Sequence, residues 1–166
     1  MQAFFSDLLP DNTSYVIVRH IGEDAKSHLQ EILQRNSHLE VREAEDNMPV
    51  EKNKVYILPA GSYMTIRDGR SHLQKRNGGH NCAIDIFLHS LAGEYKHKAI
   101  AIVLSGSGRN GVKGAGDVKA AGGMVIAQQP SSAEFPSMLE HAIQAGYADK
   151  VLLPTEMPTA IRQFTH

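Results

Sequence analysis

The sequence predicts an α/β fold of three layers, in which helices cover both faces of a doubly wound, mostly parallel sheet. Short apolar runs typical of buried strands alternate along the 166 residues with stretches of helical period. The chain is long enough to bury the core of one domain, and no repeat, linker or low-complexity segment divides it. We therefore expect one domain over residues 1–166.

The predicted strands are short runs rich in branched apolar residues and bounded by polar residues, Gly or Pro. For the parallel sheet they are residues 15–19, 39–42, 55–58, the run that begins at Ala99, residues 124–127 and residues 151–153. Asp68 and Gly69 separate two further runs, residues 63–67 and 70–74. Both tolerate a positive φ, so a small antiparallel hairpin is expected there.

The predicted helices place apolar residues three or four positions apart and end near Gly or Pro. They are residues 3–9, a helix that Asp24 caps and that contains Leu29, Ile32 and Leu33, and residues 83–91, 112–121, 136–145 and 158–164. Ligands bind such sheets beyond the carboxyl ends of the strands. His20 and residues 59–62, 105–111 and 128–132 should therefore meet at one rim.

Composition excludes several classes of partner. The formal net charge is −1 and no basic block is long enough to follow a phosphate backbone, so we expect no nucleic acid partner. The single cysteine, Cys82, excludes an internal disulfide and fits a reducing compartment. No apolar run approaches the ~20 residues of a membrane span, and the first residues do not resemble a signal peptide. We expect a cytoplasmic protein without membrane insertion.

The turn SGSGRNG at residues 105–111 follows a buried strand and precedes a helix, which is where α/β proteins place their chemistry. Gly106, Gly108 and Gly111 spell a dinucleotide-binding fingerprint. The acidic residue expected at the end of the next strand is missing, since that strand ends in Gln128. We therefore interpret the glycines as permitting a tight turn and predict no cofactor.

His20 and Asn110 lie at two strand ends, near the hydroxyls of Ser105 and Ser107. A nucleophilic hydrolase needs a hydroxyl, a base and a carboxylate that orients the imidazole. Only the imidazole is clearly present, because position 110 carries a neutral amide. The other histidines are scattered without the spacing of metal ligands, so no metal site is predicted.

Stretches along nearly the whole chain resemble the catalytic domain of CheB, the chemotaxis protein-glutamate methylesterase. They are YVIVRHI, MPVEKNKVYILPAGSYM, HNCAIDIFLHSLA, AIVLSGSGRNGVKG and AAGGMVIAQQPSSAEFPSML, in the order and at the spacing of that family. The resemblance implies a doubly wound α/β domain that hydrolyses glutamyl methyl esters on chemoreceptor helices and, in some members, deamidates glutamines there. It implies no metal and no cofactor.

Carried over by position, the resemblance makes His20 the catalytic histidine and places Asn110 where the family has its catalytic aspartate. The oxyanion-stabilising turn falls on Ser107 and Gly108. The substrate rim that we expect around them contains Pro59, Gly61, Ser105 and Arg109.

The nucleophilic serine of the family has no counterpart here, because it belongs to a strand and turn that precede the position of Ala3. In the family that strand lies between the strand carrying His20 and the strand carrying Ser105. We expect the two exposed strand edges either to pair directly or to be covered in a homodimer.

These departures favour a degenerate methylesterase domain, retained as a binding or regulatory module for a chemoreceptor or another signalling protein. The alternative is an active methylesterase or glutamine deamidase whose serine turn is missing from this chain. A small-molecule binding module stays open, since a pocket can outlast catalysis. Ser105 and Ser107 could replace the nucleophile, but their place in the turn favours hydrogen bonding to the backbone.

Overall fold

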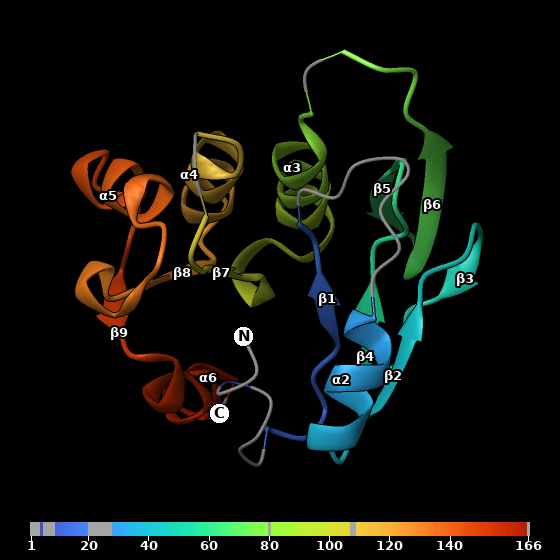
Figure 1. Cartoon of the computed structure of the whole chain (residues 1–166), viewed down its shortest axis with the longest axis horizontal. Coiled ribbons are helices and arrows are strands. Elements are labelled where there is room, and N and C mark those ends of the chain that lie inside the picture. Colours follow the sequence, from blue (N-terminus) through green and yellow to red (C-terminus); the bar gives the residue numbers. More distant parts are fainter. Residues whose placement is uncertain (1–3, 5–8, 20–27, 80, 107–108, 166) are drawn as a thin grey trace.

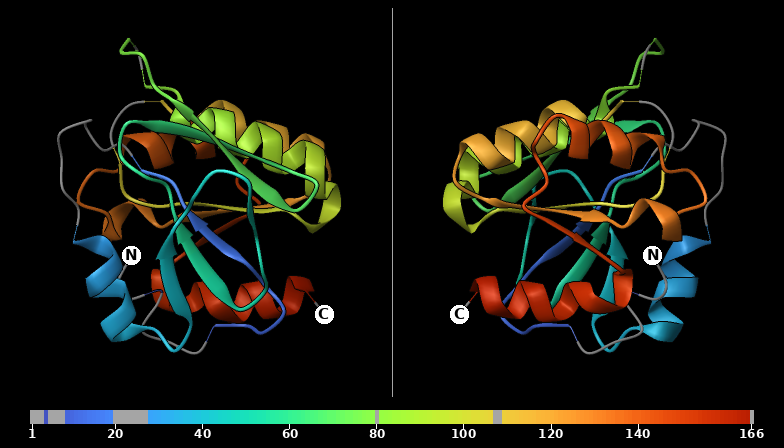
Figure 2. Two further views of the ribbon diagram at one scale, coloured as in Figure 1. Left: turned by 90° about the vertical axis from the view of Figure 1, so that its right-hand side faces the viewer. Right: turned by 90° about the vertical axis from the view of Figure 1, so that its left-hand side faces the viewer.

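The computed structural model describes residues 4, 9–19, 28–79, 81–106 and 109–165. Its strands form a middle layer with helices on both sides (Figures 1 and 2), which confirms the α/β fold class. Helices α3 (Ala83–Tyr95), α4 (Val112–Ala120) and α5 (Ser137–Gln144) cover one face, and α2 (Leu29–Asn36) and α6 (Met157–Thr165) lie on the other.

The parallel strands form two sheets. One has the order β1 (Tyr15–Ile17), β4 (Lys54–Ile57), β2 (Glu40–Glu43), and the other has the order β7 (Ile100–Val103), β8 (Met124–Gln128), β9 (Lys150–Leu152). Every neighbouring pair within them is parallel. Among the described residues β1 pairs only with β4 and β7 only with β8, so β1 and β7 do not pair directly.

The predicted hairpin is confirmed: β5 (Ser62–Arg67) and β6 (Arg70–Lys75) pair in antiparallel register across Asp68 and Gly69. Both turn residues have the positive φ that the sequence indicated, 52° and 71°. The short strand β3 (Met48–Pro49) also pairs with β6 and was not predicted. Two residues are too few to show a period, and proline is tolerated at a sheet edge but is unusual within a strand.

The predicted helices are present wherever the structure describes them, and α3 continues four residues beyond Leu91, to Tyr95. Of the expected helix at residues 3–9, only Phe4 and Leu9 are among the described residues. Asp24, the predicted cap of the next helix, lies outside them. No helix in the described part of the chain is long and apolar enough to cross a membrane.

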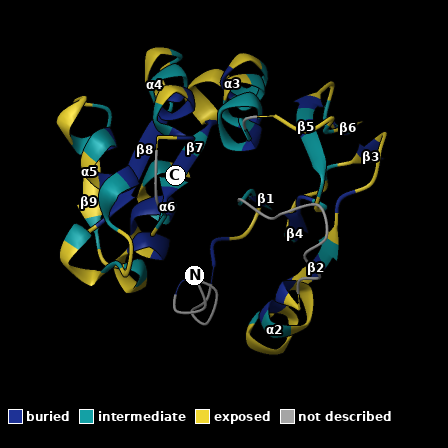
Figure 3. Ribbon diagram, turned by 45° about the horizontal axis from the view of Figure 1, so that its top comes forward, coloured by how far each residue is buried: buried dark blue, intermediate teal, exposed yellow. Residues whose placement is uncertain are grey.

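Three apolar clusters form the core. The first packs strands of both parallel sheets against α2 and α6, the second packs β7 and β8 under α3, α4 and α5, and the third joins α3 to the hairpin. Strand β8 is buried along its whole length, as Figure 3 shows. Helix α3 belongs to two clusters, because Leu88, Leu91 and Tyr95 contact both the second and the third.

Helices α3 and α4 approach each other closely because Gly114 has no side chain. A Cβ atom at Gly114 would lie 2.6 Å from Cβ of Leu88 and 3.1 Å from Cα of Asp85. The second contact is to backbone, which cannot rotate away. The glycine therefore sets the distance between the two helices.

We expect Gly114→Ala to destabilise the protein by about 1–3 kcal/mol, the usual cost of overpacking. Gly93→Ala is the matched control in the same helix pair, since a Cβ there meets no atom within 4 Å. That change should be neutral or stabilising by about 0.5–1 kcal/mol. Urea denaturation of both variants measures the difference, and equal stability would contradict the packing described.

Tyr15 provides a test in alkaline solution. Its hydroxyl donates to the Pro10 carbonyl over 3.1 Å, and burial raises the pKa of the phenol from 10.0 to about 12. Because the folded state holds this proton more tightly, stability should fall as the pH rises from 10 through 12. Tyr15→Phe should remove this part of the alkaline loss, as measured by thermal melting between pH 8 and 12. An unchanged pH profile would show that another group dominates.

Candidate active site

Two of the four segments predicted to share a rim are in direct contact. The Ser105 N–H, just after β7, donates to Oε1 of Gln128 over 3.0 Å. Nε2 of the same amide donates to the carbonyl and the hydroxyl of Ser132, at 3.2 and 3.1 Å. Gln128 is buried, so its amide joins the ends of β7 and β8 from inside. Sequence reasoning placed Gln128 at the rim, where an acid had been expected, but did not find these hydrogen bonds.

Ser105 serves the turn as a hydrogen-bonding residue. Its Oγ accepts the Phe135 N–H over 3.0 Å, and the next residue, Gly106, donates its N–H to the Phe135 carbonyl over 2.9 Å. The Ser105 hydroxyl thus hydrogen-bonds to backbone, as we expected, but its partner lies 30 residues away and not within the turn. These bonds also bring Phe135 to the rim, which the sequence analysis did not anticipate.

Asn110 ends the same turn and is buried, with 8% of its surface exposed. Its Oδ1 accepts the N–H of Asp85 in the first turn of α3, over 3.1 Å. The amide therefore satisfies one of the backbone donors that the start of a helix leaves without a partner. This contact joins the turn to α3.

The side chain of Asp85 in turn binds the N-terminus of α4. Its Oδ1 accepts the N–H of Gly111 over 2.9 Å and the N–H of Gly114 over 2.8 Å, both at the N-terminus of α4. A carboxylate is favoured there by the helix dipole as well as by the hydrogen bonds. Gly111 has φ 104°, a value that favours glycine. We call this reciprocal arrangement the Asp85–Asn110 pair.

The Asp85–Asn110 pair determines which way the amide is turned. A backbone N–H needs an acceptor, so the oxygen of Asn110 faces Asp85 and the nitrogen lies on the opposite side of the side chain. That nitrogen can only donate hydrogen bonds. A carboxylate in the same rotamer would cap α3 equally well and offer an acceptor on its other side.

The other half of the predicted rim follows β1 and β4. The Leu58 N–H donates to the carbonyl of Ile17 over 3.0 Å, which holds the ends of these strands together. Pro59 and Gly61 come next and are partly exposed. His20, Ser107 and Gly108 lie outside the described residues, and Arg109 is exposed at the turn. Whether Pro59 and Gly61 share a rim with Asn110 stays a prediction.

Among the described residues, no three His, Cys, Asp or Glu side chains are grouped in a way that could hold a metal ion.

An open cavity of ≈ 400 Å³ lies between β9 and α6. It is lined by Lys150, Leu152, Thr155, Glu156, Thr159, Ala160 and Gln163, none of which belongs to the candidate site.

We expect Asp85→Ala to cost about 1–2 kcal/mol, the effect of removing a good helix cap. Asp85→Asn keeps an acceptor oxygen and should cost less. Asp117→Ala is the control, since its ion pair with His89 is on the surface and such pairs contribute about 0–1 kcal/mol. Chemical denaturation gives all three values. If Asp85→Ala were no worse than Asp117→Ala, the carboxylate would not be holding α4.

Comparisons with known proteins agree with the resemblance in the sequence. A family model described as CheB methylesterase matches residues 1–161. The crystal structure of the Thermotoga maritima CheB methylesterase catalytic domain superposes with a TM-score of 0.87 at 30% identity, covering 98% of this chain and 89% of that one.

Relatives in several bacteria are similar over most of the chain. The protein-glutamate methylesterase/protein-glutamine glutaminase of Thermotoga maritima is 35% identical over 158 residues, which is 90% of this chain and 46% of the relative. An Anaeromyxobacter dehalogenans protein of the same description is 29% identical, covering 99% of this chain and 49% of the relative. An uncharacterised 104.1 kDa protein of Rhodobacter capsulatus is 38% identical over 73% of this chain and 13% of its own length. The chain thus spans about half the length of the two methylesterases.

Proposed function

Because this chain belongs to the CheB methylesterase family, we propose that it recognises glutamyl side chains of a signalling protein but hydrolyses their methyl esters poorly. The Thermotoga relative is named as acting on protein glutamate and protein glutamine. We extend the recognition part of that activity to this chain, with a chemoreceptor as partner and the cytoplasm as location. We do not extend the relative's rate of hydrolysis to this chain.

The orientation of Asn110 carries the proposal. From the resemblance to the family we expect this residue beside the imidazole of His20, where a carboxylate would accept a hydrogen bond from the ring N–H. Since Oδ1 of Asn110 faces the Asp85 N–H, the proposal has the Nδ2 donor on the side of the imidazole. A ring nitrogen facing Nδ2 must then be unprotonated, and the proton moves to the other ring nitrogen. That tautomer cannot take a proton from a serine hydroxyl.

The amide also fails to stabilise positive charge. A base that has taken a proton becomes an imidazolium, and a neutral amide cannot compensate its charge as a carboxylate does. In a serine protease the same replacement lowers turnover by about 10⁴. Binding depends on rim contacts that do not pass through this relay, so recognition can persist while hydrolysis is lost.

A second candidate is an active methylesterase or glutamine deamidase. The 35% identity to the Thermotoga enzyme favours it. In this candidate a serine is supplied from outside residues 1–166, and Asn110 is a tolerated variant. The two candidates differ in turnover and agree in binding.

Asn110→Asp tests the proposal. We would measure methanol release from a methylated chemoreceptor fragment, using the 166-residue chain and any longer natural form of it. Wild-type turnover should lie at least about 10³ below that of the Thermotoga enzyme, and Asn110→Asp should raise turnover by about 10²–10⁴ wherever a serine is present. Affinity for the fragment should change little.

Asn81→Asp is the matched control, because Asn81 is likewise a neutral amide whose Oδ1 accepts a backbone N–H at the start of α3, that of Ala83. It should leave turnover unchanged. Wild-type turnover within about tenfold of the Thermotoga enzyme would contradict the proposal and support the active candidate.

A further inference from the structure

Phe135 is the most exposed large hydrophobic residue in the described part of the chain. It is 55% exposed, compared with 43% for Val151 and 39% for Leu153. Single apolar side chains are common on protein surfaces and need no function. What distinguishes Phe135 is how its backbone is held and which turn holds it.

Three hydrogen bonds fix the backbone around Phe135 to the turn that starts at Ser105. The Phe135 N–H donates to Ser105 Oγ, the Phe135 carbonyl accepts the Gly106 N–H, and the Met138 N–H donates to the Gly106 carbonyl over 3.3 Å. Met138 also packs under the turn, since a Cβ at Gly106 would lie 2.8 Å from its Cε. The backbone of Phe135 is thus held in place, while its ring is exposed.

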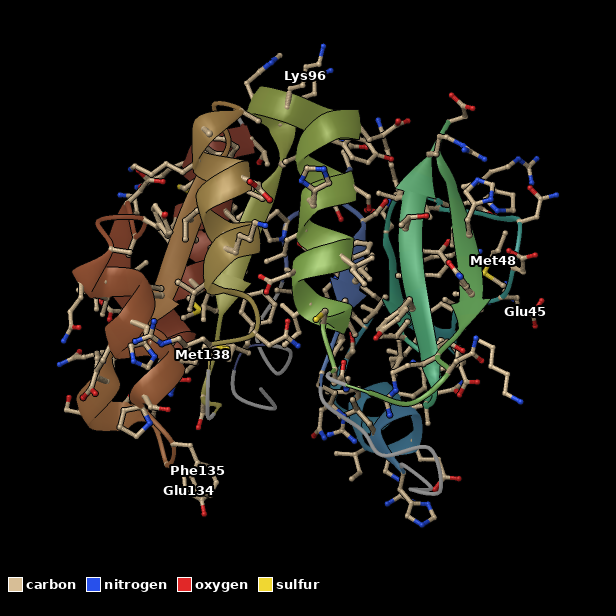
Figure 4. The ribbon with its side chains drawn as sticks, turned by 90° about the horizontal axis from the view of Figure 1, so that it is seen from above. Glu45, Met48, Lys96, Glu134, Phe135 and Met138 are labelled. Atoms are coloured by element: carbon tan, nitrogen blue, oxygen red, sulfur yellow. The ribbon has the colours of Figure 1, made fainter. Side chains whose placement is uncertain are left out.

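The ring projects from the edge of the molecule at which α4 begins. Figure 4 shows Phe135 and Glu134 extending beyond the ribbon there, with Met138 closer to α4 and Lys96 at the opposite end of α3. The turn that holds Phe135 is the one that ends at Asn110. Arg109, next to Asn110, is exposed as well. An exposed ring is therefore tied by its backbone to one end of the stretch 105–111, and an exposed cation lies beside Asn110 at the other end.

We propose that Phe135 is a specificity-determining residue, whose ring packs on an apolar side chain of the partner one helical turn away from the glutamyl residue that enters the site. The inference rests on the proposed function and names the partner more closely. The partner is an acidic helical segment, in which residues three or four apart share a face. Arg109 attracts the acidic segment, and Phe135 selects among such segments.

Two physical reasons support this role. Aromatic residues, Phe among them, are enriched in the buried core of protein interfaces. A side chain whose base is already fixed loses little conformational freedom on binding, so more of the contact energy appears as affinity. An exposed ring on a mobile loop would lack the second advantage.

The test uses two helical peptides of about 20 residues, each with one glutamate methyl ester. The first has leucine four residues from the ester, and the second has alanine there. Affinities are measured by fluorescence anisotropy for wild type, Phe135→Ala, Phe135→Leu and the control Val151→Ala. Val151 is also exposed and apolar but lies on β9, which β8 separates from β7 and the turn.

We expect Phe135→Ala to weaken binding of the leucine peptide by about tenfold and of the alanine peptide by less than about twofold. Phe135→Leu should lie between Phe135→Ala and wild type, and Val151→Ala should match wild type. Thermal melting of Phe135→Ala should equal that of wild type, because the ring is exposed.

Equal losses for both peptides, or no loss for either, would overturn the role of Phe135 while leaving glutamyl recognition in place. Failure of the wild-type protein to bind either peptide would overturn both this inference and the proposed recognition. A loss with Val151→Ala as large as with Phe135→Ala would also contradict it, since any exposed apolar residue would then have the same effect.

Discussion

The close contact between α3 and α4 is the constraint on which the candidate site depends. Gly114 permits the approach, and the Asp85–Asn110 pair then joins the two N-termini by hydrogen bonds in both directions. Helix α3 is itself held by the hairpin, because Ser90 Oγ and Glu94 Oε1 accept backbone N–H groups of β5 and its turn. The position of the turn at residues 105–111 therefore follows from packing on both sides of α3.

In the proposed function position 110 would have two tasks, and they make different demands. Capping α3 needs one acceptor oxygen, which an amide and a carboxylate supply equally. Serving a histidine base needs a second acceptor and a negative charge, which only the carboxylate supplies. An aspartate at this position can consequently change to asparagine without loss of the fold, while the chemistry of the relay changes. The shape shared with a relative, at a TM-score of 0.87, is therefore no measure of activity.

Much of the fold could be predicted from the sequence because the signals are local. The period of apolar residues indicates β8 and α3, and Asp68 with Gly69 indicates the hairpin. The site was harder to predict. Asp85 bonds residues 26 and 29 positions away, and Gln128 bonds Ser105 at a separation of 23. Such contacts between side chain and backbone have no local pattern, and Asp85 reads in sequence only as an acid near the start of a helix.

The two ends of the turn are held by different neighbours, and neither set of contacts requires catalytic chemistry. Gln128 and Phe135 hold the start of the turn, whereas Asp85 holds its end. All of these are hydrogen bonds to backbone groups, which are insensitive to whether residue 110 is an acid or an amide. In the proposed function, a site built in this way keeps its shape although residue 110 carries no charge. Selection for recognition alone would then preserve the rim, and the site would pass from hydrolysis to binding without a change of fold.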